Sequence, residues 1–130
     1  MKYMVMLGGS KAMADWFMSW TPQEHAAQGL YMEQLHTDLA AEGVLVGGEG
    51  LSFPHEALIV RAAANGTPIT DGVFPESKEF LMGYTLIDVE SLDDAVRIAA
   101  RFSAAPGPGG TPSNMPIELR RIMSGRADGE

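Results

Sequence analysis

The segment Met82-Gly83-Tyr84-Thr85-Leu86-Ile87-Asp88-Val89 decides the fold, together with Ser91-Leu92-Asp93-Asp94, which follows it after Glu90. Its aromatic, β-branched and aliphatic side chains predict a strand over 82–89 that is apolar on both faces. Ser91 is a favourable helix N-cap and the two aspartates suit the first helical turn, so we expect a helix to begin there. Its predicted buried stripe consists of Leu92, Val96, Ala99 and Phe102.

The chain beyond this helix returns to a strand. Residues 106–116 contain four prolines and three glycines, which neither a helix nor a central strand tolerates. In Ile117–Ile122 apolar residues alternate with charged ones, which predicts a last strand. The second half of the chain is therefore predicted to be a β-α-β unit.

The first half repeats this pattern. Lys2–Leu7 is apolar after its lysine and predicts a buried strand that ends at Gly8-Gly9-Ser10. Thr21-Pro22-Gln23-Glu24 combines an N-cap, a proline at the first helical position and a glutamate that completes a capping box, so a helix is predicted over 22–42. Val44–Val46 then predicts the next strand. The expected apolar stripe of the helix consists of Ala27, Leu30, Tyr31, Leu35 and Leu39.

A hairpin is predicted between the two halves. Ala57–Ala62 and Thr67–Thr70 read as strands, and Asn65-Gly66 between them favours the positive φ angles of a tight turn. The order β-α-β, hairpin, β-α-β predicts one α+β domain over residues 1–130, with a ferredoxin-like antiparallel sheet and both helices on one face. Because strand 82–89 is apolar on both faces, we expect a homodimer to cover the open face.

The composition excludes several classes of partner. Seventeen acidic and nine basic residues give a formal charge of −8, and no cluster of Lys and Arg could follow a phosphate backbone, so nucleic acid is not expected as a partner. The chain has no cysteine, which removes disulfides and thiolate metal sites and fits a reducing compartment. The apolar run at the start is shorter than a signal-peptide core or a membrane span, so we expect a cytoplasmic protein without a membrane partner.

Neither a metal nor a cofactor is expected. His25 and His36 share the helix 22–42 but lie about 16 Å apart along its axis, and His55 follows a proline in a loop. These spacings do not suit a common zinc or iron site. Neither Gly-x-x-x-x-Gly-Lys-Ser/Thr nor Gly-x-Gly-x-x-Gly occurs, so nucleotide binding has no support, and the Gly-x-Ser-x-Gly elbow of serine hydrolases is absent too.

The loop after the hairpin offers a candidate site. It gathers the carboxylates of Asp71, Glu76 and Glu79 and the cation of Lys78 around the apolar anchor Phe74. These groups either line a polar pocket or hold the loop to the core by local pairs, with Phe74 buried. His36 can act as an acid or base near neutral pH, or be an ordinary packed or solvated helix histidine.

An aromatic group follows the first strand. Trp16, Phe17 and Trp20 lie in a stretch for which no helix or strand is predicted. Exposed aromatics are unfavourable unless they are covered, so these side chains are expected to cap the core or the dimer seam, or else to form a lid over a ligand.

The stretch Asp71-Gly72-Val73-Phe74-Pro75-Glu76-Ser77-Lys78-Glu79, followed by Gly83-Tyr84, resembles the signature of the YCII-related proteins of the DGPF type. Val73 stands where their Asp-Gly-Pro-Phe hallmark has proline. Gly48-Glu49-Gly50-Leu51, Arg61 and Glu118-x-Arg120 also fall where that family has similar residues. The resemblance covers nearly the whole chain, and it implies a dimeric α+β barrel.

Some YCII-like relatives carry a His-Asp pair that is proposed as an acid/base site. The corresponding positions in this chain fall at Met32 and near Phe102-Ser103, so the resemblance does not bring a dyad with it. The sequence therefore leaves two hypotheses open. The first is a small-molecule-binding protein or enzyme with a metal-free acid/base pocket, and the second is a noncatalytic dimeric binding or regulatory module. The first predicts His36 and Asp71 as catalytic residues, with Met32, Phe74, Glu76, Lys78 and Glu79 as ligand-binding residues.

Overall fold

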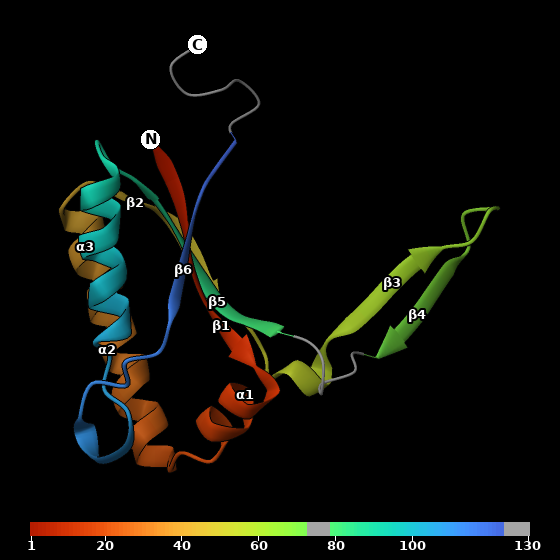
Figure 1. The fold of residues 1–130 in the computed structure, drawn as a ribbon, viewed down its shortest axis with the longest axis horizontal. Coiled ribbons are helices and arrows are strands. Elements are labelled where there is room, and N and C mark those ends of the chain that lie inside the picture. Colours follow the sequence, from red (N-terminus) through yellow and green to blue (C-terminus); the bar gives the residue numbers. More distant parts are fainter. Residues whose placement is uncertain (73–78, 124–130) are drawn as a thin grey trace.

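The computed structural model describes residues 1–72 and 79–123 (Figure 1). Within them, the predicted strands and helices occur in the predicted order, with one additional helix after the first strand. The strands are β1 (Lys2–Ser10), β2 (Leu45–Gly50), β3 (Leu58–Ala62), β4 (Pro68–Gly72), β5 (Glu79–Asp88) and β6 (Ile117–Arg121). The α-helices are α1 (Lys11–Met18), α2 (Pro22–Ala41) and α3 (Leu92–Ser103), and single 3₁₀ turns lie at Pro54–Glu56 and Pro108–Gly110.

The main sheet has four strands in the order β2-β5-β1-β6, and every neighbouring pair is antiparallel. Because β1 and β2 are both antiparallel to β5, they are parallel to each other with β5 between them. In the same way β5 and β6 are both antiparallel to β1, so they are parallel to each other with β1 between them. Helix α2 connects the first pair and α3 connects the second, so two split β-α-β units are interleaved in one sheet. The predicted α+β class with an antiparallel sheet is confirmed.

Helices α2 and α3 lie side by side on one face of this sheet (Figure 1). The core lies between the two layers, where Leu39 of α2 and Ile87 of β5 are completely buried. Side chains alternate along β5, so Thr85 and Ile87 point toward the helices and are buried, while Tyr84 and Leu86 point the other way and are half-buried. The helix face of the sheet is thus the inner face of the subunit.

The helix starts follow the capping signals. The Thr21 hydroxyl accepts from the Glu24 backbone N–H at 3.1 Å, and the Glu24 carboxylate accepts from the Thr21 N–H at 2.9 Å, which is a complete capping box. Ser91 caps α3 in the same way, accepting from the Asp94 N–H at 3.1 Å. After α2 the chain turns at Gly43, whose φ of 79° suits a residue without a side chain.

The predicted buried stripes need correction. Leu30, Leu92 and Val96 were expected inside, but each is more than half exposed. In both helices the buried stripe is rotated around the helix axis from the predicted one, because polar or small residues occupy part of the inner face. The buried residues of α2 are Gln28, Leu35 and Leu39, and those of α3 are Ala95, Ile98, Ala99 and Phe102.

The first strand is longer than predicted, and a helix follows it directly. Strand β1 continues through Gly8-Gly9 to Ser10, where Gly9 is paired with Phe80. A Cβ on Gly8 would lie 2.4 Å from the carbonyl oxygen of Phe80, so glycine is what permits this close approach. Ser10 then caps α1, accepting from the Met13 N–H. The expectation that no helix or strand contains Trp16 and Phe17 is therefore wrong.

The predicted hairpin is confirmed as β3 and β4, which form a separate two-stranded sheet that projects from the main one (Figure 1). Its turn is closed by a hydrogen bond from the Gly66 N–H to the Ala63 carbonyl at 2.8 Å, and the φ of Gly66 is 86°. Leu58, Val60 and Ile69 of this hairpin are more than half exposed.

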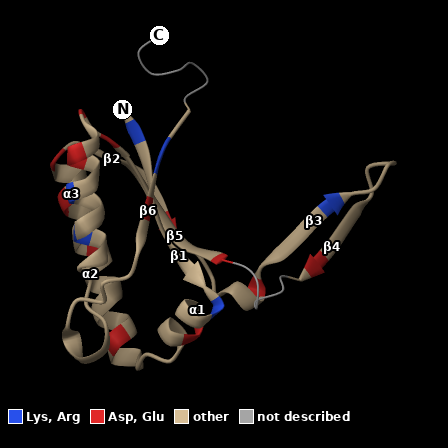
Figure 2. Cartoon of the chain, viewed as in Figure 1, with Lys and Arg blue, Asp and Glu red and all other residues tan. Residues whose placement is uncertain are grey.

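Charged side chains lie on the helices, the hairpin, the edge strand β6 and the ends of the central strands, as Figure 2 shows. In β1 and β5 they are Lys2, Glu79 and Asp88, so the middle of both central strands is uncharged. Within the described part of the chain, no helix has the length and apolar character needed to cross a membrane.

Candidate functional site

A cavity of about 300 Å³ lies between the helix face of the main sheet and α2. Its floor is formed by the sheet, where Val5 is paired with Thr85, and Leu7 with Gly83. Paired residues of neighbouring antiparallel strands point to the same side, so these four positions face the helices together. Because Gly83 has no side chain, the floor is open at this point.

One stripe of α2 forms the wall of the cavity. Gln28, Met32 and His36 are spaced by four residues, and side chains at this spacing lie above one another on a helix. Gly29 lies beside them and is exposed, which places it at the cavity mouth. The stripe therefore presents an amide, a thioether and an imidazole in sequence along the cavity.

Aromatic side chains close the remaining sides. Phe17 of α1, Phe53 before β3 and Phe102 of α3 all line the cavity. Phe17 and Phe53 belong to a cluster with Trp20 and His25, in which the ring centroids of Phe17 and Trp20 are 4.8 Å apart and those of Phe17 and His25 are 4.7 Å apart. This cluster covers one end of the cavity, and its apolar lining is typical of small-molecule sites.

His36 makes a direct hydrogen bond to the sheet. Its Nε2 lies 2.8 Å from the hydroxyl oxygen of Thr85, and its ring packs against Phe102 at a centroid distance of 5.9 Å. Thr85 is only 3% exposed. A hydroxyl both donates and accepts, so this pair is satisfied whichever ring nitrogen of the neutral imidazole carries the proton. The imidazole is thereby held at the cavity wall in a fixed orientation.

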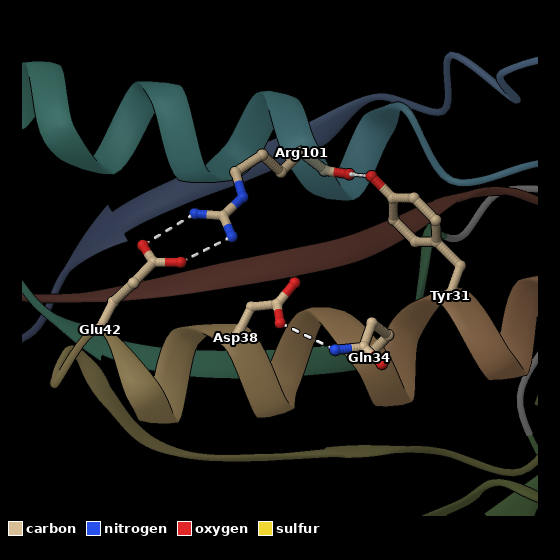
Figure 3. A network of polar contacts seen from close by, with 5 residues as sticks. All are labelled: Tyr31, Gln34, Asp38, Glu42 and Arg101. Carbon is tan, nitrogen blue, oxygen red and sulfur yellow. Dashed lines mark hydrogen bonds and ion pairs between the residues drawn. The ribbon is translucent and has the colours of Figure 1, made fainter.

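A polar network between α2 and α3 holds the two helices together (Figure 3). The guanidinium of Arg101 donates two hydrogen bonds to the carboxylate of Glu42, at 3.0 and 2.8 Å, and the Tyr31 hydroxyl donates to the Arg101 carbonyl at 2.7 Å. The hydrogen bonds from Arg101 lower the pKa of Glu42, and the same contact raises the pKa of Arg101. Alongside them, the Gln34 amide donates to Asp38 at 2.8 Å.

The N-terminal end of α2 is also attached to the rest of the subunit by hydrogen bonds. The Glu24 carboxylate accepts from the Gly109 backbone N–H at 2.9 Å, in addition to its bond within the capping box. Hydrogen bonds from the backbone N–H groups of Thr21 and Gly109 lower the pKa of Glu24. Both ends of the helix that carries the cavity wall are thus attached to the α3 side of the molecule.

One buried donor in the wall has no partner. Gln28 is 7% exposed, and within the described residues its Nε2 makes no hydrogen bond. The indole Nε1 of Trp20 is in the same condition, but Trp20 does not line the cavity. Buried polar groups in folded proteins are nearly always hydrogen-bonded, so this unpaired amide nitrogen is an unfavourable feature of the single chain.

A second, larger hollow of about 600 Å³ lies between the C-terminal end of α2 and α3. Except for Glu90, its charged groups are already paired within the protein. Arg101 binds Glu42, Arg97 binds Asp94, and the N-terminal ammonium binds Asp88. Because these charged groups already bind one another, few of them are available to a ligand, and this hollow is the weaker candidate for a site.

The predicted site residues fall in three groups. Met32 and His36 lie together in the cavity wall. Asp71 is exposed on β4, opposite Ile59, and accepts a hydrogen bond from the N–H of the next residue, while Glu79 is exposed at the start of β5. Neither carboxylate lines the cavity. Phe74, Glu76 and Lys78 lie outside the described residues.

Sequence reasoning missed Gln28 and Thr85. The four-residue spacing that connects Met32 to His36 also leads back to Gln28, so the stripe was available as a signal. Thr85 lies on the same strand face as Ile87, but its contact with His36 depends on how the helix lies over the sheet. No group of three or more His, Cys, Asp or Glu within residues 1–72 and 79–123 is arranged to hold a metal ion.

Comparison with known proteins gives two similarities. A family model described as the YCII-related domain matches residues 1–110. An uncharacterized protein of Rhizobium meliloti (strain 1021) is 40% identical over 66 residues, which are 51% of this chain and 49% of that protein. The match thus spans about half the length of this curated relative.

Proposed function

Because the chain belongs to the YCII-related domain family, we propose that it binds a small organic molecule in the cavity beneath α2, with His36 as the acid or base that exchanges a proton with it. The observation that carries this proposal is the hydrogen bond between His36 and Thr85 in the wall of an otherwise largely apolar cavity. Enclosed apolar space with a few fixed polar groups is the usual form of a small-molecule site.

The geometry supports acid/base chemistry in a simple way. Thr85 holds the imidazole, and Phe102 packs against the ring, so His36 is positioned before a ligand arrives. An imidazole fixed at the wall of a largely apolar cavity can accept a proton from a bound molecule or donate one to it. The participation of Asp71 and Glu79 stays a prediction, since the cavity is formed without them.

A second candidate function is binding without catalysis, in a noncatalytic binding or regulatory module. It is favoured by the identity of the group beside His36, which is the hydroxyl of Thr85 and not a carboxylate. A carboxylate would stabilise an imidazolium, whereas a threonine hydroxyl does so only weakly. The two candidates separate once a ligand is known, because His36→Gln abolishes turnover but leaves affinity nearly unchanged if His36 is catalytic.

The subunit is proposed to pair with a second copy through the open face of its sheet, as in a dimeric α+β barrel of ferredoxin-like halves. The two central strands of this face are apolar, with Met4, Met6, Tyr84 and Leu86 half-buried in the single chain, while Glu118 and Arg120 of the edge strand β6 pair with Met6 and Met4. Light scattering should then give about twice 13.9 kDa. Leu86→Glu should yield monomers, and Val96→Glu on the exposed side of α3 should not; a wild-type monomer at micromolar concentration would contradict the proposal.

The binding proposal is tested by blocking the cavity mouth. A Cβ on Gly29 meets no atom within 4 Å, so Gly29→Leu places a side chain at the mouth without a clash and replaces a poor helix former. Ala26→Leu adds a similar side chain at an exposed position of the same helix that does not line the cavity. In a thermal-shift screen of small organic metabolites, compounds that stabilise the wild type should still stabilise Ala26→Leu but not Gly29→Leu. Equal responses of both variants would place binding elsewhere.

A further inference from the structure

The hairpin of β3 and β4, residues 58–72, exposes apolar side chains that its own subunit does not cover. Every strand residue in it except Ile59 is exposed, and the exposed fractions of Leu58 and Val60 are 68% and 61%. A two-stranded hairpin is only marginally stable in water unless it packs against another element. Contact with a partner would therefore stabilise this hairpin, which we call the arm.

The strand register gives the arm two different faces. Paired residues point to the same side, and neighbours along a strand point to opposite sides. Arg61 and Asp71 thus lie on one face, together with Ile59 and Ile69. The other face carries no charge and consists of Leu58, Val60, Ala62, Pro68, Thr70 and Gly72. An exposed apolar surface on one side of an element is typical of a contact surface.

The arm lies where a second copy of the chain would meet it. It leaves the main sheet on the side away from α2 and α3, which is the side of the open sheet face (Figure 1). It is also continuous with that face, because it follows the edge strand β2 in the chain and precedes the central strand β5. A copy that covers the open face therefore has the arm beside it.

The apolar part of the open face is small for a stable dimer. Strands lie about 4.8 Å apart and rise about 3.4 Å per residue, so each outward side chain of a sheet covers roughly 30 Å². The four apolar residues at the centre of the open face cover about 130 Å² in outline, whereas a stable interface buries about 800 Å² per partner. The uncharged face of the arm has six positions at the same spacing, so it more than doubles the uncharged area.

The composition of the arm suits a protein partner. Residues 58–72 carry one basic and one acidic side chain and no aromatic ring. Segments that bind a membrane surface combine many basic residues with large apolar anchors, and nucleic-acid sites need clustered Lys and Arg. Each chain has a formal charge of −8, so two copies repel each other, and an uncharged contact surface does not add to this repulsion.

We propose that the hairpin is a dimerisation arm, and that its uncharged face packs against the second copy that covers the open sheet face. In a two-fold symmetric pair each subunit receives the arm of the other. Leu58 and Val60 are the apolar anchors of this contact. The inference rests on the proposed pairing through the open face, to which it adds a second contact surface.

Two substitutions on opposite faces of the arm test the inference. Val60→Glu places a charge on the uncharged face, and Ile69→Glu places the same charge on the other face, at residues that are 61% and 52% exposed in the single chain. Sedimentation equilibrium measures the dissociation constant of the dimer, and circular dichroism verifies that both variants are folded. Val60→Glu should raise the dissociation constant at least about tenfold, because each dimer loses the burial of two valines. Ile69→Glu should change it by less than about threefold.

Thiol reactivity gives a second readout that does not require the dimer to be weakened. The chain contains no cysteine, so a single introduced thiol reports on one position. Thr70→Cys lies on the uncharged face, opposite Val60, and Ile69→Cys lies on the other face. The rate of reaction with iodoacetamide is measured at protein concentrations below and above the dissociation constant. Thr70→Cys should react several times more slowly once the dimer forms, and Ile69→Cys should keep its rate.

Each result that contradicts the arm is distinct from failure of the pairing. Equal dissociation constants for Val60→Glu and Ile69→Glu would overturn the arm, and so would a Thr70→Cys rate that does not depend on protein concentration. If Leu86→Glu is monomeric in that case, pairing through the open face stands without the arm. A wild type that stays monomeric at micromolar concentration would overturn the arm and the pairing together.

Discussion

Thr85→Val tests whether the hydrogen bond between His36 and Thr85 supports the subunit. Valine has nearly the shape of threonine and suits a strand, so the change removes the hydroxyl and little else. Thr85 is 3% exposed and its hydroxyl lies 2.8 Å from His36 Nε2, so the variant leaves a ring nitrogen without a partner in a confined space. We expect a loss of about 1 to 2 kcal/mol in the free energy of unfolding.

A double-mutant cycle isolates this contact. In a His36→Leu background both polar partners are gone, so Thr85→Val should be nearly neutral there, which gives a coupling of about 1 kcal/mol. Urea unfolding of the four proteins measures it. Thr70→Val, an exposed threonine on β4, is the matched control and should show no coupling to His36. A coupling below about 0.3 kcal/mol for Thr85 would refute the argument that this hydrogen bond positions the imidazole.

Three further perturbations test the packing and the electrostatics. Leu39→Ala, at a side chain with 0% exposure, should lower the free energy of unfolding by about 2 to 5 kcal/mol in urea, and a loss under about 1 kcal/mol would contradict its place in the core. Gly8→Ala should be clearly destabilising, because its Cβ would meet a backbone carbonyl at 2.4 Å, whereas Gly47→Ala meets no atom within 4 Å and should change stability far less. The contact with Arg101 lowers the pKa of Glu42 below its ordinary value of about 4.5, so the unfolded chain binds a proton at Glu42 more readily than the folded protein does. The ion pair therefore stabilises the fold above about pH 4.5, and this stabilisation is lost as the pH falls through the pKa of Glu42 in the folded protein. Glu42→Gln should therefore be less stable than the wild type at neutral pH, and the difference should disappear in acid; a difference independent of pH would contradict the ion pair.

Local signals in the sequence were sufficient for most of the fold. The capping box at Thr21 and the cap at Ser91 predicted two helix starts, because these hydrogen bonds form between residues three apart in the chain. Asn65-Gly66 predicted the hairpin turn for the same reason. The helix α1 was missed because Ser10 follows two glycines, which read as the end of a strand and not as a strand paired closely with Phe80.

The interior arrangement required tertiary information. Leu30 continues an apolar pattern but is exposed, and Gln28 breaks the pattern but is buried, since the sheet determines which side of α2 faces inward. Hydrophobic periodicity alone assigns the more apolar side to the core, and here it erred by part of a turn.

The candidate site was predicted only in part. His36 was named as a helix histidine and Met32 as the position where some relatives carry their histidine, and the two lie together in the cavity wall. Asp71 was expected beside them because the loop after the hairpin gathers charged residues in sequence. The structure places Asp71 on a hairpin that projects from the main sheet, and the sequence contains no local signal for the direction of that hairpin.

The methyl group of Met32 provides the most direct test of ligand binding in this cavity. It can be observed by NMR after ¹³C labelling of the methionine methyl groups, with the half-exposed Met18 as an internal control away from the cavity lining. On titration with acetophenone, the Met32 signal should shift and show contacts to the aromatic protons of the probe, while the Met18 signal should stay in place. An unchanged Met32 signal under conditions where the probe binds the protein would contradict the account.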